Sequence, residues 1–407
     1  MSRIDELIER LCPDGVEYAA LGDLCEKTEN IKWKNVGSDD FFYIDLTSVD
    51  IRLHRIAETS LVNAANAPSR AQQIVRTGDV IFATTRPTQM RVCRITDIYD
   101  GQICSTGFCV LRPSDKVLSN YLMHSLGTAD FFKYLEDNQT MGNYPAISNK
   151  MLLKYRIPVP PMEIQEEIVQ VLDSFAELEA ELEAELEARR LQYSHYRDEL
   201  LKFTERESVS GLKLGDFGTF TRGKRFTAAN YVDVGIGSIH YGEIYTRYGT
   251  SARQTYSFLP MAMRSSLRFA KHGDVVIAAT GENVEDLCKA VAWLGEEDVA
   301  VHDDCCIFSS NADPRYVVHA LLTSSVAAQK ERLVSNGKVS RISGKNLASI
   351  TIPVPPLEEQ ERIVAILDKF DALVNDISQG IPAEIEARRK QYAYYRDKLL
   401  SFKEKVA

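Results

Sequence analysis

The chain has 407 residues, of which 44% are apolar and 26% charged, and its formal net charge is −10. This length allows two or three domains with cores of their own, and the apolar fraction is ordinary for a globular protein. No run of about 18 apolar residues is present, and the amphipathic N-terminus lacks the apolar stretch of a signal peptide. We therefore expect a cytoplasmic protein without a membrane span.

Cysteine and histidine usage predicts no metal centre. The eight cysteines include no C-x-x-C pair, and the seven histidines add no metal-ligand spacing. Scattered cysteines of this kind are typical of small buried side chains in a reducing compartment.

Residues 1–20 form an N-terminal helical segment that resembles a later part of the chain. Asp5-Glu6-Leu7-Ile8 lies before Leu21 at the spacing by which Asp198-Glu199-Leu200-Leu201 lies before Leu214, and a similar stretch ends the chain at 397–400. The chain thus begins with the tail of a repeat unit. We expect its two ends to come together in a near-circle with pseudo-twofold symmetry.

Residues 21–162 form a first mixed block. VRTGDVIFATT at 75–85 is typical of a turn followed by a buried strand, and Tyr121–Tyr134 is typical of a helix. Arginine reads guanine, and Asn or Gln reads adenine, in the DNA major groove. Segments of this block that mix basic, amide and aromatic residues with glycine are therefore candidates for DNA contact. The alternative for each of these segments is a solvated loop. The candidate DNA-binding residues of this block are Thr85, Arg86, Thr88, Gln89, Arg91, Asn143 and Tyr144.

Residues 163–207 form a long helix that carries most of the acidity. Apolar residues recur three or four apart, as in a coiled-coil seam, and 14 acids stand against 5 bases. The tetrapeptide AELE occurs three times in succession at 176–187. Because four residues turn a helix by about 400°, an added copy returns almost to the same face. The repeat is either a ruler of adjustable length or a helix-forming filler.

Residues 208–357 form a second mixed block. RFAKHGDVVIAAT at 268–280 again indicates a turn and a buried strand, and Tyr316–Leu333 a helix. GTFTRGKR at 218–225 resembles a phosphate loop but lacks its final Ser or Thr, so a basic turn that contacts DNA is favoured. His302-Asp303-Asp304 is interpreted as a loop or strand edge. The candidate DNA-binding residues here are Arg222, Lys224, Arg225, His240, Tyr241, Lys338 and Arg341.

Residues 358–407 form a second helical segment that nearly copies the first. IPVPPMEIQEEIV at 157–169 returns as IPVPPLEEQERIV at 352–364, and ARRLQYSHYRDELL at 188–201 returns as ARRKQYAYYRDKLL at 387–400. Gly380-Ile381-Pro382 predicts a break or kink with Pro382 in a new first turn. We expect the two helices to pair as an antiparallel coiled coil. Candidate partner-binding residues in these repeats are Tyr193, Tyr196, Arg197, Tyr392, Tyr395 and Arg396, although the tyrosines could instead pack the helix pair.

The two mixed blocks correspond weakly, so the whole chain is a tandem duplication. Leu21-Gly-Asp matches Leu214-Gly-Asp, and Gly78-Asp-Val matches Gly273-Asp-Val. Residues 20–150 have a net charge of −1 and residues 212–347 of +2, so each block can carry a local basic face. The predicted fold class is α+β, with two mixed domains in pseudo-twofold tandem, separated by two long helices.

Catalytic motifs are missing. Pro13-Asp14 begins like a nuclease motif, but Tyr18 stands where that motif needs a lysine. No glycine-rich loop with a downstream N-P-P-Y or D-P-P-Y supports base methylation. We expect a chain that reads DNA without acting on it.

The doubled helical motifs resemble those of the specificity subunits of Type I restriction–modification systems, over essentially the whole chain. The opening LCPDGVEY at 11–18 and FGTFTRGKRFT at 217–227 also resemble that family. The resemblance implies two target-recognition domains, each reading half of a split, asymmetric DNA site. It implies conserved helices that space these domains and dock two methyltransferase subunits, with restriction–translocase subunits joining.

The same resemblance implies no catalytic centre or cofactor in this chain. S-adenosylmethionine, ATP and magnesium would be used by the partner subunits, and double-stranded DNA would be the shared substrate. Two alternatives remain at this stage: the specificity partner of a related methyltransferase–nuclease outside Type I, and a structural coiled-coil adaptor.

Overall fold

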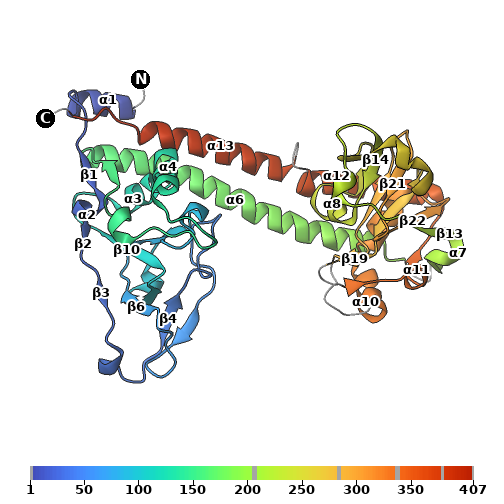
Figure 1. Ribbon diagram of the computed structural model, residues 1–407, viewed down its shortest axis with the longest axis horizontal. Coiled ribbons are helices and arrows are strands. Elements are labelled where there is room, and N and C mark those ends of the chain that lie inside the picture. The colour runs from blue at the N-terminus through green and yellow to red at the C-terminus, as the bar shows by residue number, and fades with distance from the viewer. Residues whose placement is uncertain (1–2, 204–208, 282–285, 335–339, 377–379, 406–407) are drawn as a thin grey trace. The chain divides into compact units, whose positions relative to one another are not determined.

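The computed structural model describes residues 3–203, 209–281, 286–334, 340–376 and 380–405. The chain folds into two compact units, unit 1 from residues 1–182 and 385–407 and unit 2 from residues 183–384. Helix α6, Met162–Leu200, belongs to unit 1 in its first half and to unit 2 in its second half (Figure 1). None of the described helices is both long and apolar enough to cross a membrane.

Unit 1 contains a five-stranded sheet of order β3-β6-β9-β4-β5, a four-stranded sheet of order β2-β10-β7-β8, and the strand pair β1–β11. The pairings are antiparallel except for β4 with β9, where Tyr43 lies opposite Ile103. The strands are β1 Tyr18–Ala20, β2 Cys25–Glu26, β3 Glu29–Asn30, β4 Phe41–Ile44, β5 Ser60–Val62, β6 Ala71–Ile74, β7 Val80–Ala83, β8 Val92–Arg94, β9 Ile103–Ser105, β10 Phe108–Pro113 and β11 Arg156–Pro158.

Unit 2 repeats the central pairings of this topology. Its sheets have the orders β13-β22-β18-β20-β15 and β16-β14-β21-β17, and β12 pairs with β24 as β1 does with β11. The pair β14–β21 is parallel like β4–β9, and the edge strand β15 adds a second parallel pair with β20. A short pair, β19–β23, is added. The strands are β12 Gly211–Lys213, β13 Gly218–Arg222, β14 Ile236–Ile239, β15 Ser251–Ala252, β16 Ser257–Leu259, β17 Phe269–Ala270, β18 Val275–Ala278, β19 Thr280–Gly281, β20 Ala290–Trp293, β21 Val299–Val301, β22 Cys305–Ser310, β23 Ser340–Arg341 and β24 Thr351–Pro353. The duplication inferred from the sequence is therefore confirmed at the level of the sheets.

Each helix predicted after the sheet strands is in fact two helices. The segment 121–134 is divided between α3 and α4, and the segment 316–333 between α9 and α10. The hydroxyl of Thr128 accepts from the amide of Phe131, and that of Thr323 from the amide of Val326, so a threonine cap starts a new helix in both units. The helices and 3-10 turns outside the two long helical segments are α1 Arg3–Leu11, α2 Leu21–Leu24, η1 Trp33–Asn35, η2 Pro87–Gln89, η3 Asp97–Tyr99, α3 Ser119–Ser125, α4 Ala129–Asn138, α5 Asn149–Leu152, α7 Leu214–Phe217, η5 Ala228–Asn230, α8 Tyr241–Thr246, η6 Met261–Ser266, α9 Pro314–Leu321, α10 Ser324–Leu333 and α11 Gly344–Ala348.

The second helical segment is broken where the sequence predicted it. Helix α12 spans Leu357–Asn375, and α13 spans Ile381–Leu399 with Pro382 in its first turn. In unit 1, Phe175 stacks on Tyr395 with ring centroids 5.5 Å apart, and Glu179 pairs with Arg389. Because the contacts ascend α6 while they descend α13, the two helices are antiparallel there.

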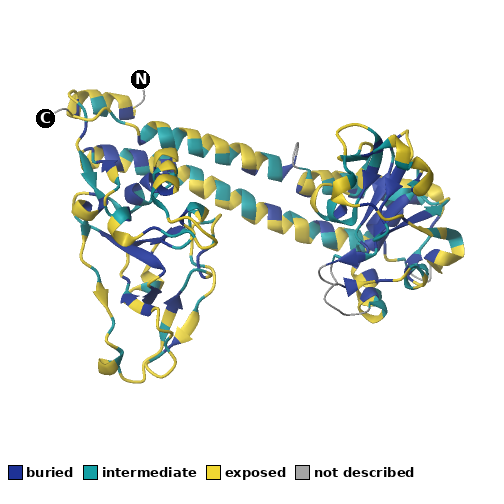
Figure 2. Cartoon of the chain, in the orientation of Figure 1, coloured by how far each residue is buried: buried dark blue, intermediate teal, exposed yellow. Residues whose placement is uncertain are grey.

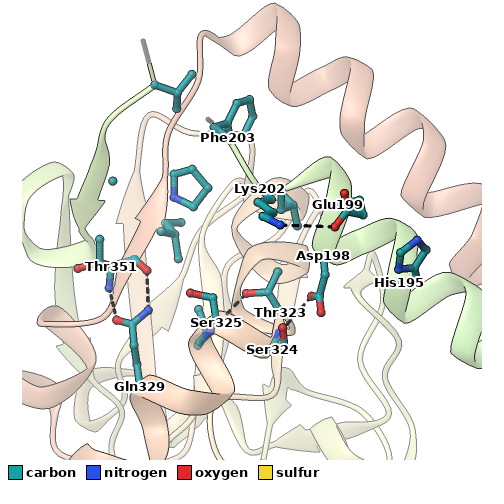
Figure 3. A pocket seen from close by; sticks show the side chains of 16 residues that line it. His195, Asp198, Glu199, Lys202, Phe203, Thr323, Ser324, Ser325, Gln329 and Thr351 are labelled. Carbon is teal, nitrogen blue, oxygen red and sulfur yellow. Dashed lines mark hydrogen bonds and ion pairs between the residues drawn. The ribbon is translucent and has the colours of Figure 1, made fainter. Parts of the chain in front are cut away.

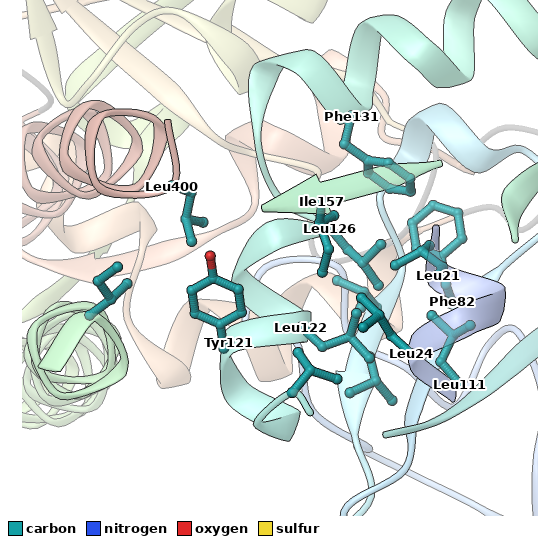
Figure 4. Close-up of a cluster of buried hydrophobic side chains, with 14 of the residues drawn as sticks. Leu21, Leu24, Phe82, Leu111, Tyr121, Leu122, Leu126, Phe131, Ile157 and Leu400 are labelled. Carbon is teal, nitrogen blue, oxygen red and sulfur yellow. The ribbon is translucent and has the colours of Figure 1, made fainter. Parts of the chain in front are cut away.

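A continuous apolar core joins the mixed domain of unit 1 to its helices. Strand residue Phe82 and helix residue Phe131 lie edge to face, 5.2 Å apart, and the cluster continues to Ile164 and Ile168 of α6 (Figure 4). Buried residues line the sheets and the inner helix stripes, while the outer helix faces are exposed (Figure 2). The mixed domain is thus fixed to its helices by hydrophobic burial, the main favourable term in folding.

The two ends of the chain meet in unit 1, as the wrapped repeat predicted. Val16 and Glu404 form a parallel bridge, and the hydroxyl of Tyr18 donates to the carbonyl of Phe402 over 2.9 Å. Helix α1 lies along the start of α6, where Arg3 pairs with Glu167 at 2.8 Å. Helix α1 therefore covers the N-terminal end of α6 within unit 1.

Candidate DNA interface

Five predicted residues of unit 2 come together around one cavity of about 450 Å³. They come from the end of β13, the start of α8 and β23, and they share the cavity with the loop between β21 and β22. The predicted residues are Arg222, Arg225, His240, Tyr241 and Arg341. Lys224 is exposed on the same turn, and Lys338 lies outside the described residues.

The basic turn is built against the end of β21 by a close backbone approach. A Cβ on Gly223 would lie 2.1 Å from the carbonyl oxygen of His302, so a side chain there is excluded. The amide of Lys224 donates to the carbonyl of Val301 over 2.9 Å. The glycine therefore lets the two basic residues that follow it, Lys224 and Arg225, project beside the sheet.

Aromatic and imidazole rings form one wall of this cavity. His302 is 6% exposed, and its ring centroid lies 4.3 Å from that of His240 and 4.9 Å from that of Phe226. Burial, and then the neighbouring His302, lower the pKa of His240. Because its Nδ1 accepts from the amide of Gly242, His240 also caps α8. Its neutral ring can still offer Nε2 to a base edge.

The sequence interpretation did not count His302, Asp303 and Asp304 as site residues. They do form a loop between two strands, but this loop lies in the candidate cavity. Asp304 accepts from the hydroxyl of Thr280 over 3.0 Å, whereas the side chain of Asp303 is 30% exposed. The carboxylate of Asp303 lies 3.9 Å from a guanidinium nitrogen of Arg222 and 3.3 Å from Nε2 of His302. A partly exposed carboxylate in such a position can accept from the amino group of cytosine. A sequence signal did exist, since charged residues stood between two apolar strands.

The same three residues are the one group of potential metal ligands close together in the described part of the chain. The ring of His302 is already used at both nitrogens, because Nδ1 accepts from the amide of Asp304 and Nε2 lies 3.0 Å from the carbonyl of Phe226. Only two carboxylates would then remain as protein ligands, fewer than the three or four that a zinc site takes. The residues therefore fit base recognition better than zinc binding.

In unit 1, two predicted segments far apart in the sequence meet. Thr85 forms a bridge with Ala146, and the guanidinium of Arg86 lies 5.2 Å from the ring centre of Tyr144. Tyr144 is 73% exposed. Thr88 and Gln89 lie in η2, directly after Arg86, and Asn143 precedes Tyr144. The predicted residues thus share one exposed surface.

The backbone of this surface is strained. Arg86 has φ of 51° and Met90 φ of 54°, so a left-handed residue stands on each side of η2. Such residues persist where the surrounding structure imposes them, often at ligand sites. Arg91 differs from its neighbours, because its Nη1 donates to the carbonyls of Leu46 and Val49 over 2.7 and 2.9 Å. The structure favours a supporting role for Arg91.

The two surfaces overlap at one topological position. Thr280 lies opposite Arg341 in unit 2 as Thr85 lies opposite Ala146 in unit 1, and Arg222 shares a small cavity with Thr280 and Arg341. The rest of the unit 2 surface, with Arg225, His240 and Tyr241, comes from the end of β13 and the start of α8 instead. The chemistry differs, because unit 1 presents an Arg–Tyr pair and unit 2 an imidazole-lined cavity.

A cavity of about 740 Å³ in unit 2 is a different site, at the end of α6 (Figure 3). Asp198 accepts from the amide of Ser324, and the side chain of Gln329 exchanges two hydrogen bonds with the backbone of Thr351. The corresponding cavity of unit 1 measures only about 340 Å³, where Tyr18 and Tyr155 line it. Neither cavity is lined by a predicted DNA-binding residue.

The predicted partner-binding residues lie on the helices but are mostly turned into their own unit. Tyr193 is 5% exposed, and burial, reinforced by Asp371, raises its pKa. Burial likewise raises the pKa of Tyr392 to about 12. Arg197 and Arg396 stack over Tyr193 and Tyr392, at 5.2 and 5.4 Å. Tyr196 and Tyr395 stack on Phe370 and Phe175, respectively, and Tyr196 is 42% exposed.

A family model described as the Type I restriction modification DNA specificity domain matches residues 13–188 and again residues 208–387. The chain belongs to this family. Each match of this specificity family contains one mixed domain and the first part of the helical segment that follows it. The two mixed domains, residues 18–158 and 211–353, are hereafter recognition domains 1 and 2.

Individual members of the specificity family agree with this assignment. The chain is 34% identical over 302 residues to the Type I restriction enzyme EcoR124I/EcoR124II specificity subunit of Escherichia coli, covering 71% of this chain and 72% of that protein. It is 30% identical over 305 residues to a putative type I restriction enzyme specificity subunit of Haemophilus influenzae, covering 72% and 74%. Since these relatives are named as specificity subunits, the chain has a specificity role and not a catalytic one.

Solved structures show the same fold. One match is a chain from a structure that concerns the complex assembly and conformational transition of the type I R-M system. The TM-score is 0.64 and the identity 22%, and the match covers 95% of this chain and 97% of that one. The Type-I restriction-modification S subunit from M. genitalium matches with a TM-score of 0.52 and 13% identity, covering 95% and 96%. At these identities the likeness concerns the fold.

Proposed function

We propose that each recognition domain reads one half of a bipartite, asymmetric DNA site through the surface described above. The observation that carries the proposal is that the pairing of Thr85 with Ala146 recurs as that of Thr280 with Arg341, and that different polar side chains gather beside it in the two domains. Similar frames with different side chains are suited to reading two different half-sites. The surface of domain 1 centres on Arg86 and Tyr144, and that of domain 2 on Arg222, Arg225 and His240.

The helical segments are proposed to set the distance between the half-sites and to dock two methyltransferase subunits, with restriction subunits joining this assembly. Exposed apolar side chains support docking, since Leu178, Leu191 and Tyr394 are 45%, 73% and 62% exposed. S-adenosylmethionine, ATP and Mg²⁺ would be used by the partner subunits, and the assembly would act on double-stranded DNA in the cytoplasm. The family match favours this role over a coiled-coil adaptor or a partner of a nuclease outside Type I.

Methylation mapping tests the division of labour between the domains. The chain is produced with its methyltransferase subunits, and the methylated motif is read by sequencing. Arg86→Ala with Tyr144→Ala should relax one half of the motif, and Arg222→Ala with His240→Ala the other. Loss of a good base contact costs about 1–3 kcal/mol in discrimination. Equal changes in both halves for either pair of substitutions would contradict the proposal.

A further inference from the structure

One buried histidine in unit 1 contacts both helices. His124 of α3 is 2% exposed. Its Nε2 lies 2.7 Å from Oδ1 of Asp173 on α6, and its Nδ1 lies 2.8 Å from the hydroxyl of Tyr392 on α13. A single side chain of recognition domain 1 is therefore hydrogen-bonded to both members of the helix pair.

Unit 2 contains the same arrangement. His319 of α9 is fully buried, its Nε2 lies 2.9 Å from Oδ1 of Asp368 on α12, and its Nδ1 lies 3.1 Å from the hydroxyl of Tyr193 on α6. The roles of the helices are reversed between the units, since α6 supplies the carboxylate in unit 1 and the hydroxyl in unit 2. We call each His–Asp–Tyr set a clasp: His124, Asp173 and Tyr392 form clasp 1, and His319, Asp368 and Tyr193 form clasp 2.

The clasps have been kept while the helices around them diverged. Aligned by position, SNYLMHS at 119–125 and PRYVVHA at 314–320 share only the tyrosine and the histidine. The second partner of the carboxylate has changed as well, because Asn120 donates to Asp173 whereas Arg315 donates to Asp368. A residue that merely filled space would be expected to diverge with its apolar neighbours.

The chemistry of the clasp fixes an angle as well as a contact. A neutral imidazole donates from one nitrogen and accepts at the other. Nε2–H donates to the carboxylate, and Nδ1 accepts from the tyrosine hydroxyl, so both partners must lie near the plane of the ring. Hydrophobic burial has no such directionality. Burial alone would raise the pKa of Asp173, but the hydrogen bonds from His124 and Asn120 outweigh it and lower that pKa.

In both units a second hydrogen bond joins the recognition domain to a long helix, at the start of α3 in unit 1 and of α9 in unit 2. The side-chain oxygen of Gln165 accepts from the amide of Leu118 over 3.0 Å, and that of Gln360 accepts from the amide of Asp313 over 2.9 Å. Both glutamines are buried. Each recognition domain is thus held to the helices at the start of α3 or α9 and again near its end. Two separated directional ties resist rotation better than one.

We propose that the two clasps are positioning joints that set the angle of each recognition domain on its helix pair, and hence the spacing at which its half-site is read. His124 and His319 are positioning residues in this proposal, which rests on the proposed function of the domains. Clasp 1 controls the placement of the half-site read by domain 1, and clasp 2 that of domain 2.

The experiment measures methylation by the assembled methyltransferase on duplexes with the native spacer and with spacers one base pair shorter or longer. Tyr392→Phe removes one hydroxyl but keeps the ring, and His124→Phe removes both bonds. Both should lower the preference for the native spacer, His124→Phe by about tenfold, the scale of one lost hydrogen bond to a charged group. Asp173→Asn keeps an acceptor for Nε2–H and should retain the preference.

The controls separate positioning from simple stability. His195→Phe changes an exposed residue of α6 and should leave the spacer preference unchanged. If Tyr392→Phe and His124→Phe lower methylation equally at all three spacers, the clasps only stabilise the fold and the proposal is overturned. If the unmodified complex shows no bipartite site at all, the proposed function fails instead. Tyr193→Phe and His319→Phe repeat the test for clasp 2.

Discussion

The two recognition domains share a frame and differ in the surface that they present. Sheet order, the parallel pair at the centre of one sheet, the clasps and the capping threonines recur in both units. The candidate DNA surfaces differ in their side chains, since domain 1 has an exposed Arg86–Tyr144 pair and domain 2 has a cavity lined by His240 and His302. Within one chain, residues kept in both copies mark what holds the domain, and residues that changed mark what it reads.

The first way to test this comparison uses an ion pair that only unit 1 has. Arg112 donates two bonds to Asp79 at 2.9 Å, and both side chains are buried. In unit 2 the matching Asp274 accepts from the amide of Lys271, and Ser309 stands in place of the arginine. Asp79→Ala should lower the free energy of unfolding by about 3–5 kcal/mol, because it leaves a buried arginine unpaired.

Asp274→Ala is the matched control and should cost only about 1 kcal/mol, the net value of a turn hydrogen bond. Urea unfolding of both variants, followed by circular dichroism, measures the difference. Losses of similar size would show that the pair adds nothing specific to unit 1.

The second prediction concerns the carboxylate that the sequence interpretation missed. Asp303→Asn replaces an acceptor by a group that also donates, and it should change the preferred base at one position of one half-site. The expected change in discrimination is about 1–3 kcal/mol. Methylation sequencing should show the other half of the motif unaltered. An unchanged motif would indicate that Asp303 only positions Arg222, whose Nε donates to the backbone carbonyl of Asp303.

The third prediction separates phosphate contacts from base contacts on the basic turn. Replacing Lys224 and Arg225 by alanine should weaken binding by roughly 1.4 kcal/mol, about tenfold, without changing the motif. Two lost phosphate contacts should also lower the slope of log K against log salt by about two. The salt dependence of binding is measured for the assembled complex, with exposed Arg332→Ala as control. An unchanged slope would place the turn away from the DNA backbone.

The fourth prediction, with the smallest expected effect on stability, concerns the number of AELE copies in α6, the helix that both units share. Adding or deleting one AELE copy at 176–187 keeps helix formers and nearly the same face, so the melting temperature should change little. Each copy changes the helix length by about 6 Å, which corresponds to one or two base pairs. Both half-sites should persist while the spacer between them shifts. The same spacer for two, three and four copies would show that the segment is only filler.

The sequence predicted the features that depend on local pattern. The duplication, the long helix, the break before Pro382 and the meeting of the chain ends all followed from repeats and helix periodicity. It also placed Arg222, Arg225 and His240 among the candidates, although their convergence on one cavity depends on the register of β13 against β22.

Features that depend on a single capping residue or on distant contacts were not predicted. The division of the 121–134 segment depends on the Thr128 cap, a weak local signal that the apolar pattern concealed. The pairing of His124 with Tyr392 joins residues 268 positions apart, so nothing near either residue announces it. The loop at 302–304 was placed correctly, but its role could not follow without the strands that bring it to Arg222.

The strand pairs β1–β11 and β12–β24 have a consequence for how such chains change. The chain enters recognition domain 1 on β1 and leaves it on the antiparallel neighbour β11, with Tyr18 opposite Pro158; domain 2 repeats this with Gly211 opposite Pro353. The two ends of each domain are therefore adjacent, as in an inserted cassette. A foreign segment that forms this strand pair and carries a Tyr-x-x-His helix would fit the same frame, so a new DNA target can be acquired by recombination without rebuilding the helices.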